Sequence, residues 1–430
     1  MKLLIKNGFV IDKSGDLFGK YNILIEDDKI FDITPDDISE EIATEVIDAE
    51  GLIVAPGLVD MHCHLREPGF ERKETIATGS RSAAAGGFTT IACMPNTNPV
   101  IDNKTVVEYV LSQAKTNAVI DVYPIGAITK NLEGKCLASI GEMKFAGIVA
   151  ISDDGRPVMD SNIMKNAMVY AASFDTPVIS HCEDTNLVCG GVMNEGYYST
   201  IMGLRGIPAS AEEAMIARDL VLARSLNIPI HIAHVSTRNG IQIIREAKAA
   251  GVLVTCETCP HYFSLTHEAV LGYNTAAKVN PPLRSSDDVA AVIEGLCDGT
   301  IDVIATDHAP HDPESKNCEF DRAASGMVGF ETALSLGITN LVKTGKMELS
   351  DLLYKMTAKP ADILRLNKGR LCEDGAADIV IFSEDEKRTV KAEKLQSKSK
   401  NTPFDGKELY GAVKYTICGG KVVVSQGELA

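Results

Sequence analysis

Eight short apolar runs recur in order between residues 53 and 308, and this pattern constrains the fold more than any other feature of the chain. Their sequences are IVAPGLVDMH, GFTTIACMP, VIDVYPIGA, GIVAIS, TPVISH, PIHIAH, VLVTCETCP and DVIATDH. Strands that are buried on both faces read as nearly continuous apolar runs, and helix-like stretches separate these ones, so the pattern favours parallel strands. Eight strand–helix units predict an α/β fold, a (β/α)8 TIM-type barrel. An open doubly wound sheet is the alternative, but the chain has no glycine-rich dinucleotide motif to support it.

The segment 209–226, ASAEEAMIARDLVLARSL, is the clearest of the intervening helices. Ser210 and Glu213 have the spacing of a capping box at its start. The apolar residues of the segment recur at helical spacing, which predicts one buried face. That predicted face consists of Ala214, Ala217, Leu220 and Val221.

The two ends of the chain share a different pattern. Residues 1–52 and residues from about 366 onward read as short strands punctuated by Gly and Asp, for example KLLIKNGFVID and VKYTICGGKVVVSQ. Because a few short strands are marginally stable alone, we expect the two ends to pair into one small composite β-domain. The predicted division is therefore 1–52 with 366–430 for this domain, and 53–365 for the barrel.

Charge and composition narrow the classes of partner. The net charge is −17, from 42 Lys and Arg against 59 Asp and Glu, which argues against nucleic acid or an anionic membrane as the main partner. The N-terminus, MKLLIKNGFVIDKSGD, becomes charged too early for a signal peptide, and no apolar run reaches membrane-spanning length. The eleven cysteines, an odd number scattered through the chain, do not indicate a disulfide framework. We therefore expect a cytoplasmic location.

Cys256 and Cys259 form a CxxC pair in the seventh apolar run and its exit loop. A structural zinc site of this type usually needs a second pair of ligands, and no second CxxC pair accompanies this one. A structural zinc or a redox role is therefore disfavoured for these two cysteines.

Residues of the types that commonly bind metal ions lie at the ends of five of the eight runs. They are His62 and His64 in and after the first run, Asp153 and Asp154 after the fourth, His181 at the end of the fifth, His234 at the end of the sixth, and Asp307 in the eighth. A single histidine after a strand is more often a packed residue, and a single aspartate is more often a helix cap. In a barrel, however, the carboxyl ends of all strands converge on one rim, where active sites are built. The set as a whole therefore predicts a metal centre.

Four imidazoles and two carboxylates suit zinc or a similar ion, and they are enough ligands for two ions. Two ions that lie about 3.5–4 Å apart need a bridging anionic ligand, and an aspartate after the fourth strand is placed to serve. A catalytic ion of this kind lowers the pKa of its water to about 7. The predicted reaction class is therefore metal-assisted attack on a carbonyl group.

The first run ends in HCHLREPG, which brings a cation to the same place. Positions i, i+2 and i+4 of a strand point to one face, so His62, His64 and Arg66 are expected on one side. The Arg66 guanidinium offers two parallel donors that match a carboxylate. An anionic substrate would need such a cation to overcome the net negative charge of the chain.

The motifs HCHLREPG, MPNTNP, SDDG, HCED, HIAHVST, NPPLR, TDHAPH and GMVGFETAL follow one another in this order. With them the chain resembles, over essentially its whole length, dihydroorotases of the long bacterial type, which belong to the amidohydrolase superfamily. The resemblance implies zinc-dependent, reversible cyclisation of N-carbamoyl-L-aspartate to L-dihydroorotate in pyrimidine (UMP) biosynthesis. It also implies one or two Zn²⁺ ions per chain, with two favoured.

The resemblance assigns roles to the metal-type residues one by one. His62, His64 and Asp307 match the ligands of one zinc, and His181 and His234 match those of the other. Asp154, not Asp153, matches the bridging carboxylate; the residues alone do not separate the two. Many relatives bridge the ions with a carboxylated lysine instead, but no lysine stands at the end of the fourth run. The resemblance also makes Asp307 the general acid and base that moves the proton between the nucleophile and the amide nitrogen.

The substrate contacts implied by the resemblance are His64, Leu65, Arg66, Asn96, Asn280, His311, Ser325 and Gly326. Arg66, Asn96 and His311 are expected to bind the substrate carboxylate, and Asn280 the ring amide. Backbone groups of 325–326 complete the expected set. The polar segment 311–326, HDPESKNCEFDRAASG, reads as a functional loop over the rim, and we expect it to move as a lid.

Two other functions stay open at this stage. A hydantoinase or allantoinase on the same scaffold would act on a neutral cyclic amide, and the buried Arg66 argues against it because its charge would be left unpaired. A metal-free dihydroorotase-like assembly partner would lack metal ligands, whereas every expected ligand is present. A homodimer and association with aspartate transcarbamoylase are further partners that the resemblance raises and the sequence does not decide.

Overall fold

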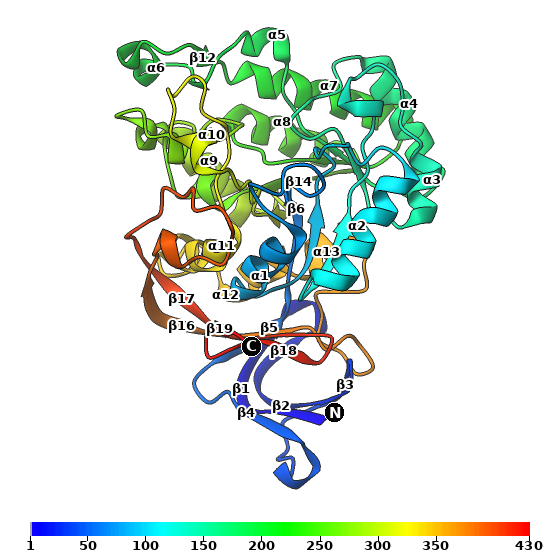
Figure 1. Ribbon diagram of the computed structural model, residues 1–430, viewed down its shortest axis with the longest axis vertical. Helices are drawn as coiled ribbons and strands as arrows, with labels where there is room; N and C mark the ends of the chain where they lie inside the picture. The colour runs from blue at the N-terminus through cyan, green and yellow to red at the C-terminus, as the bar shows by residue number, and fades with distance from the viewer. Residues whose placement is uncertain (1) are drawn as a thin grey trace.

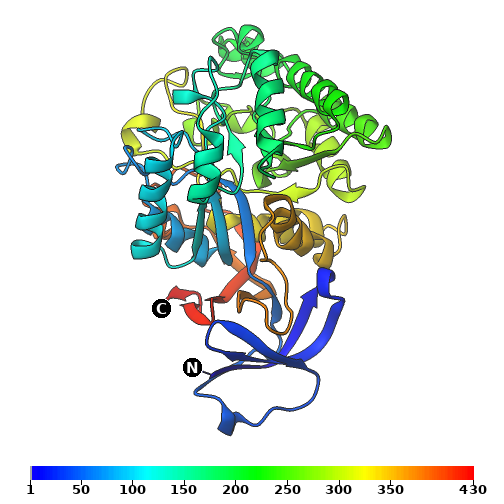
Figure 2. The ribbon, with the colours of Figure 1, turned by 90° about the vertical axis from the view of Figure 1, so that its right-hand side faces the viewer.

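The structure, a computed structural model, describes residues 2–430. Strands and helices alternate around a barrel, and the strands of the two chain ends form a sheet beneath it (Figure 1). The view from the side shows the same two layers, with both termini at the sheet (Figure 2). Of the helices in the described part of the chain, none has the length and apolar character needed to span a bilayer.

Each predicted apolar run contributes a strand to the barrel. The barrel strands are β6 (Leu58–Cys63), β7 (Phe88–Cys93), β8 (Asp121–Pro124), β9 (Ile151–Ser152), β10 (Val178–Ser180), β13 (Ile230–Ile232), β14 (Val254–Thr258) and β15 (Val303–Ile304). They pair in parallel as two arcs, β6–β7–β8 and β9–β10–β13–β14–β15. Parallel bridges from Gly126 to Ile151 and from Cys63 to His308 join the arcs into a ring. The predicted (β/α)8 barrel is confirmed.

Helices surround the ring and follow its strands. They are α1 (Ile76–Ala85), α2 (Lys104–Asn117), α3 (Ile140–Ala146), α4 (Ser161–Ala172), α7 (Ser210–Leu226), α8 (Arg238–Ala249), α9 (Ser286–Cys297), α11 (Phe330–Gly337), α12 (Leu349–Met356) and α13 (Ala358–Leu364). Short elements lie in the loops on the rim: α5 (Thr185–Val188), β11 (Met193–Asn194), α6 (Tyr197–Met202), β12 (Gly206–Ile207) and α10 (Pro313–Lys316). Side chains, not solvent, fill the barrel interior; Met61, Ile179 and Val303 belong to this inner core.

The terminal sheet joins the two ends of the chain. Its strands are β1 (Lys2–Asp12), β2 (Leu17–Glu26), β3 (Lys29–Thr34), β4 (Glu45–Asp48) and β5 (Ile53–Pro56) from the N-terminal side, and β16 (Ile379–Thr389), β17 (Glu408–Cys418), β18 (Lys421–Ser425) and β19 (Glu428–Leu429) from the C-terminal side. The two groups meet where β5 pairs with β16 in antiparallel register. The expected composite β-domain is confirmed, while the domain boundaries at 52/53 and 365/366 stay a prediction.

The first apolar run, residues 53–62, is two strands and not one. Its first half, β5, belongs to the terminal sheet, and its second half, β6, belongs to the barrel. Gly57 lies between them, and a Cβ atom there would come within 2.2 Å of the Thr89 hydroxyl oxygen. Only glycine therefore lets the chain cross from one sheet to the other at this point.

Helix α7 exists as predicted, but its predicted cap is wrong, and of the predicted buried face only Leu220 is buried. The residue before it, Ala209, is helical and makes no side-chain capping bond, so the capping box is wrong. The buried face consists of Ala211, Glu212, Met215, Ile216, Asp219, Leu220 and Ala223. This face includes two acidic residues because both carboxylates are hydrogen-bonded. The Glu212 carboxylate accepts a hydrogen bond from the Ser236 backbone amide, and the Asp219 carboxylate accepts one from the Ser180 hydroxyl. An apolar pattern does not predict a face of this kind, and Val221 is 67% exposed.

Strand β16 supplies alternate residues to two cores and so binds the terminal sheet to the barrel. Phe382 is fully buried in the larger core with Phe88 and Phe330, whereas Ile381 faces the core of the sheet. We predict that Phe382→Ala lowers the free energy of unfolding by about 3–5 kcal/mol, because it leaves a cavity between the two layers. Urea denaturation measures the loss. The control is Phe31→Ala in β3, where the ring is 58% exposed and the expected loss is below about 1 kcal/mol; equal losses would contradict this packing.

Candidate metal centre

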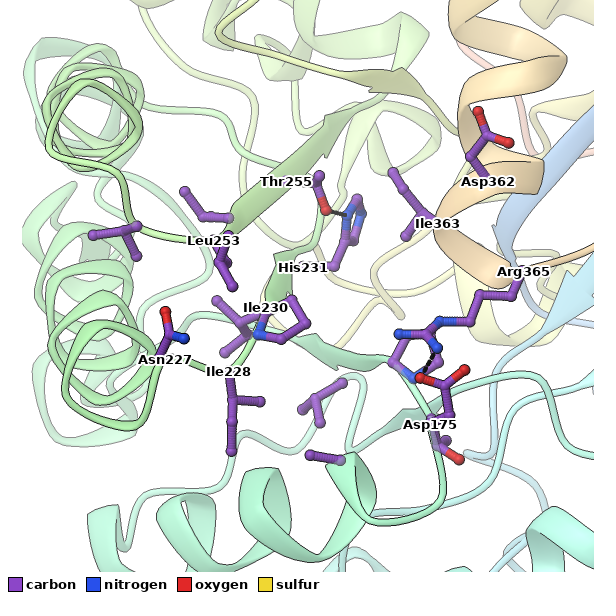
Figure 3. A pocket seen from close by; sticks show the side chains of 17 residues that line it. Asp175, Asn227, Ile228, Ile230, His231, Leu253, Thr255, Asp362, Ile363 and Arg365 are labelled. Carbon is purple, nitrogen blue, oxygen red and sulfur yellow. Dashed lines mark hydrogen bonds and ion pairs between the residues drawn. The ribbon is translucent and has the colours of Figure 1, made fainter.

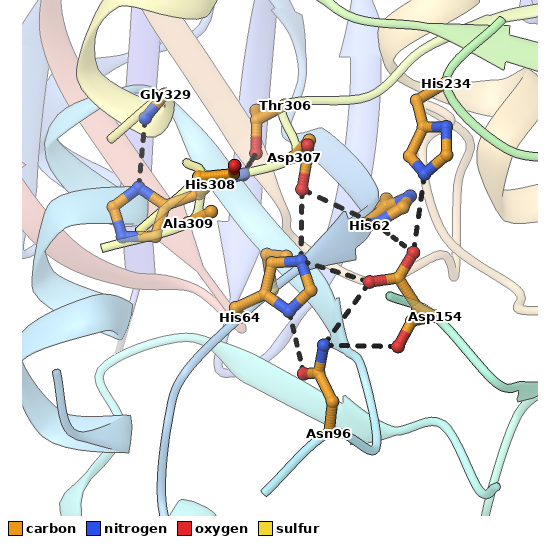
Figure 4. A network of polar contacts seen from close by, with 12 residues as sticks. His62, His64, Asn96, Asp154, His234, Thr306, Asp307, His308, Ala309 and Gly329 are labelled. Carbon is orange, nitrogen blue, oxygen red and sulfur yellow. Dashed lines mark hydrogen bonds and ion pairs between the residues drawn. The ribbon is translucent and has the colours of Figure 1, made fainter. Parts of the chain in front are cut away.

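The carboxyl ends of five barrel strands carry histidine and aspartate side chains into one cluster. Figure 4 shows part of this cluster, without a label for the residue that follows β10. Its members are His62, His64, Asp154, His181, His234 and Asp307, all of them buried. They come from segments far apart in the sequence; the hydrogen-bonded pair His64 and Asp307, for example, is separated by 243 residues. The structure thus brings together every residue that the sequence predicts as a metal ligand.

Two groups in this cluster have the geometry of ion-binding sites. In the first, ligand atoms of His62, His64 and Asp307 all lie within 4.8 Å of one another. In the second, the same holds for His62, Asp154 and His234. His181 joins the second group, because its Nδ1 lies 2.8 Å from His234 Nε2.

Asp154 lies at the centre of the cluster. Its Oδ1 is 3.4 Å from His62 Nε2, 3.4 Å from His181 Nδ1 and 3.4 Å from His234 Nε2. Its Oδ2 is 3.5 Å from His64 Nε2. This carboxylate therefore contacts both histidine pairs, as a bridging ligand must.

Asp153, the other candidate for this position, points elsewhere. Its Oδ1 accepts hydrogen bonds from the backbone amides of Ile128 and Thr129, at 2.7 and 3.0 Å. Its Oδ2 accepts the hydroxyl of Thr129. Asp153 therefore supports the loop after β8, and the geometry favours Asp154 for the cluster.

Unpaired polar atoms at the centre show that the donor set fits a cation. His62 Nε2 and Asp154 Oδ1 are buried and have no hydrogen-bond partner within the described residues. A buried polar atom without a partner costs about 1–3 kcal/mol, so such atoms are normally paired. Imidazole nitrogens and carboxylate oxygens are the ligands that zinc and similar ions prefer. A cation among these residues would satisfy both atoms.

The backbone of the site is also unusual. Arg66, His234 and Asp307 have φ angles of 64°, 34° and 45°, in the left-handed region that non-glycine residues rarely adopt. Such conformations cost of order 1 kcal/mol or more each and persist where packing fixes them, often at functional sites. All three residues lie at the rim where the strands end.

The charges of the cluster depend on one another. Burial raises the pKa of Asp154, but the neighbouring imidazoles of His62, His181 and His234 lower it by more than burial raises it. The pKa of Asp154 therefore lies well below its usual value. Burial lowers the pKa of His62, but the carboxylates of Glu257 and Asp154 more than reverse this and hold the pKa well above its usual value. Protons therefore balance the carboxylates when no ion is bound. Metal binding displaces such protons and so weakens at low pH.

Residues that the sequence reasoning missed support the cluster. Asp60 accepts hydrogen bonds from the Thr306 amide at 3.0 Å and from its hydroxyl at 2.5 Å, which fixes the residue next to Asp307. Burial raises the pKa of Asp60 to about 7. Glu257 contacts His62 on the side of the ring away from Asp154, with Glu257 Oε1 2.5 Å from His62 Nδ1. An acidic residue inside an apolar run is the sequence signal that could have identified both.

Two further missed residues line the other side. Glu183 Oε2 lies 3.6 Å from His181 Nε2. His261 is buried close to Asp307 and Cys259, and burial lowers its pKa to about 4. The His261 ring is therefore neutral at physiological pH, and its Nε2 has no partner among the described residues.

The expected carboxylate-binding residues lie beside the cluster. Arg66 donates from Nε to the backbone oxygen of Pro310 at 3.2 Å, and its Nη2 is 3.3 Å from His311 Nε2. Burial lowers the pKa of Arg66 to about 10, so it stays charged at neutral pH. Asn96 contacts the cluster itself: its Oδ1 is 2.9 Å from His64 Nδ1, and its Nδ2 is 3.4 Å from Asp154 Oδ2 (Figure 4).

The remaining expected contacts differ in what they can offer. The Leu65 side chain is 1% exposed within the core, so only its backbone could reach a substrate. Asn280 Oδ1 is buried and unpartnered within the described residues. The Ser325 carbonyl accepts from His311 Nε2 at 2.8 Å, and the Gly326 carbonyl accepts from Lys316 Nζ at 2.9 Å.

The segment 311–326 is packed against the rim and contains a short helix, α10. Asp312 caps this helix by accepting the amide of Ser315 at 2.9 Å. The buried Lys316 ammonium donates to the carbonyls of Ala324 and Gly326, at 2.8 and 2.9 Å. Movement of the segment as a lid stays a prediction.

Comparisons with known proteins find a family model, relatives and solved structures that are similar to this chain. A family model described as "Dihydro-orotase-like" matches residues 51–240. The dihydroorotase of Acetivibrio thermocellus is 58% identical over 425 residues, which cover 99% of each chain. The dihydroorotase of Ruminiclostridium cellulolyticum is 57% identical, again with 99% of each chain covered. Among solved structures, the L-hydantoinase (dihydropyrimidinase) of Arthrobacter aurescens is 28% identical with a TM-score of 0.90, covering 100% of this chain and 97% of that one.

We predict that Asp154→Asn abolishes the stabilisation of the protein by Zn²⁺, because it removes the carboxylate that all four imidazoles share. A ligand at 100 times its Kd stabilises a folded protein by about 2.7 kcal/mol. Calorimetry of chelator-treated protein, with and without added Zn²⁺, measures this as a rise in Tm. Asp153→Asn is the matched control: it lowers the Tm itself but keeps the rise. If Zn²⁺ raised the Tm of Asp154→Asn as much as it raises the Tm of the wild type, Asp154 would be excluded as a ligand.

Proposed function

The chain belongs to the dihydroorotase family, and on that premise we propose how its own residues carry out the reaction. It is a cyclic amide hydrolase, a dihydroorotase, and relatives of that name are 51% to 58% identical to it over nearly the whole chain. Dihydroorotases interconvert N-carbamoyl-L-aspartate and L-dihydroorotate in pyrimidine biosynthesis. Within the structure, the observation that supports an anionic substrate is Arg66, which is partly buried beside the metal-type cluster and forms no ion pair among the described residues.

We propose that the cluster holds two Zn²⁺ ions. His62, His64 and Asp307 would bind one ion, His181 and His234 the other, and Asp154 both. The short distances from Asp154 to all four imidazoles and the unpaired atoms at its centre support this assignment. When bound, the ions supply Lewis-acid polarisation of a carbonyl group and acidify a water molecule. Elemental analysis of protein purified without chelator tests the identity and number of the ions.

Asp307 moves the proton in this proposal. In ring opening, its carboxylate takes the proton of the attacking water and delivers it to the ring nitrogen as the C–N bond breaks. In ring closure, it removes the proton of the ureido nitrogen that attacks the carboxylate carbon and passes this proton to the departing oxygen, which takes a second proton from solvent and leaves as water. Asp307 Oδ1 lies 3.0 Å from His64 Nε2, and this contact orients the carboxylate.

Arg66 recognises the substrate carboxylate that does not react. Among the described residues 2–430, Arg66 forms no ion pair. Burial disfavours its charge, and the carboxylates of Asp307, Asp154 and Glu74 offset this only in part. A charged group in this position needs an anion, and the substrate supplies one. His311 contacts Arg66, whereas Asn96 contacts His64 and Asp154 of the cluster. Asn280 offers to a ring N–H its Oδ1, which has no partner among the described residues.

The two alternatives explain less. A hydantoinase has a neutral cyclic substrate, which would leave Arg66 without an anion, and the solved hydantoinases share the fold at 23% to 28% identity. A metal-free assembly partner has no need for the expected ligands, and all six are present and gathered. A homodimer, association with aspartate transcarbamoylase and a cytoplasmic location remain predictions from the sequence.

We predict that Arg66→Met lowers kcat/KM for dihydroorotate by at least about 30-fold, since an unpaired buried charge costs 2 kcal/mol or more. Steady-state ring opening of dihydroorotate measures the loss, with dihydrouracil, which lacks the carboxylate, as the comparison substrate. The matched control is Arg72→Met: this exposed arginine pairs with Asp312 and Glu314, and its loss should leave kcat/KM unchanged. Equal losses for both substrates would reject Arg66 as the carboxylate-binding residue.

We predict that Asp307→Asn abolishes turnover in both directions, because an amide can still contact a cation but cannot accept the proton. The loss of a general acid and base alone is worth about 10²–10⁴-fold. Spectrophotometric assays of ring opening and closure measure it, with zinc content determined on the same samples. The control is Asp302→Asn. Asp302 directly precedes β15, at the end of the strand opposite to Asp307, and its carboxylate binds Lys248, so this variant should keep the wild-type kcat. Near-normal rates in Asp307→Asn would overturn the assignment.

A further inference from the structure

A row of polar side chains crosses the barrel interior beneath the metal-type cluster. Along β13, Ile230 and Ile232 pack outward, so His231 between them points inward. Along β14, Val254 and Cys256 pack outward, which turns Thr255 and Glu257 inward. Glu257 is 0% exposed and His231 is 2% exposed. Burying an acid and an imidazole in a barrel core is costly unless they are bonded to each other or to something functional.

Hydrogen bonds connect these side chains to His62 in sequence. Glu257 Oε1 lies 2.5 Å from His62 Nδ1, and Glu257 Oε2 lies 3.2 Å from His231 Nε2. His231 Nδ1 in turn lies 2.8 Å from the Thr255 hydroxyl oxygen. The row therefore runs from a threonine near one end of the barrel to a candidate metal ligand at the other.

The direction of each hydrogen bond follows from the chemistry of a carboxylate, which can only accept. A neutral His62 ring, the form that can bind a metal ion, must then carry its proton on Nδ1 and donate it to Glu257, which leaves the lone pair of Nε2 free. That Nε2 faces Asp154 at 3.4 Å and Asp307 at 3.6 Å. Likewise His231 donates from Nε2 to Glu257 and accepts the Thr255 hydroxyl at Nδ1.

We propose that Glu257 and His231 are positioning residues that hold His62 in the tautomer and orientation needed to bind a metal ion through Nε2. Glu257 acts on His62 directly, and His231 fixes the Glu257 carboxylate from the other side. A carboxylate behind a ligating histidine raises the basicity of the ring, and removing it typically costs about 10–100-fold in metal affinity. This inference rests on the metal site proposed above.

The far end of the row is reachable from solvent. A cavity of about 590 Å³ lies at the opposite end of the barrel from the cluster, and its walls include His231, Thr255, Asn227, Leu253 and Asp362 (Figure 3). An ion pair between Arg365 and Asp175 lies on the same cavity wall (Figure 3). A small molecule can therefore approach the position of the His231 ring without passing the metal-type cluster. This access makes the role of His231 testable by replacing its ring chemically.

The first experiment measures zinc affinity in full-length protein by competition with a chromophoric chelator. We expect Glu257→Gln to lower the affinity about 10–100-fold and to lower kcat, with the KM for dihydroorotate changed less than twofold, because Arg66 and its neighbours still hold the substrate. The matched control is Glu331→Gln, since Glu331 also accepts hydrogen bonds, from Ser82 and the Gln396 amide, but contacts no member of the cluster among the described residues. It should leave zinc affinity and kcat at wild-type values.

The second experiment uses His231→Ala and decides the matter if Glu257→Gln fails to fold. We expect this variant to have a lower zinc affinity and a lower kcat than the wild type. Added imidazole should enter through the cavity, donate a hydrogen bond to Glu257 and raise the kcat of the variant at least tenfold. Furan, a ring of the same size without an N–H group, should restore nothing. Rates are divided by those of the wild type at the same imidazole concentration, because imidazole also binds zinc.

The outcomes separate this inference from the proposed function. If the wild type binds no zinc, the metal site itself is wrong. If the wild type binds zinc and Glu257→Gln binds it equally well, the site stands and the role of Glu257 is overturned. If imidazole fails to restore His231→Ala, or furan restores it equally, His231 only fills space.

Discussion

The closure of the barrel is the constraint on which the rest of the structure depends, because it holds the Asp154 carboxylate among imidazoles from three other strands. Each of these groups would be costly to bury alone. Together they leave His62 Nε2 and Asp154 Oδ1 without hydrogen-bond partners among the described residues, and a cation or protons must satisfy these two atoms. Stability and function are therefore in tension at this rim, as the left-handed backbone of His234 and Asp307 also indicates.

The terminal sheet takes part in positioning this rim. The chain passes from β5 in the sheet through Gly57 directly into β6, which ends in the metal-type histidines. On the C-terminal side, β16 pairs with β5 and packs Phe382 into the barrel core. The two ends of the chain thus brace the strand that carries His62, and a disturbance of the sheet would reach the site through continuous packing.

Local cations offset the acidity of the whole molecule at the place where an anion would bind. The net charge is −17, yet Arg66 and Lys73 both approach His311 beside the cluster. Burial lowers the pKa of Lys316 to about 7, and its ammonium bonds to backbone carbonyls of the loop 311–326. Arg66 donates to the backbone oxygen of Pro310 and forms no ion pair among the described residues, so its positive charge offsets the net negative charge of the molecule locally.

The sequence by itself determined the barrel, the pairing of the two chain ends and the candidates at the strand ends. It could do so because strand burial leaves a local pattern of apolar runs, and because the carboxyl ends of parallel strands must meet at one rim. Only the tertiary structure decided which of two adjacent aspartates faces the imidazoles, since Asp153 turns to the backbone of Ile128 and Thr129. It also decided the buried face of α7, the division of the first run at Gly57, and the placement of Glu257 and His231 behind His62. The physical reason is the same in each case: these features depend on the direction of a side chain toward a partner far away in the sequence, and local pattern carries no record of that partner.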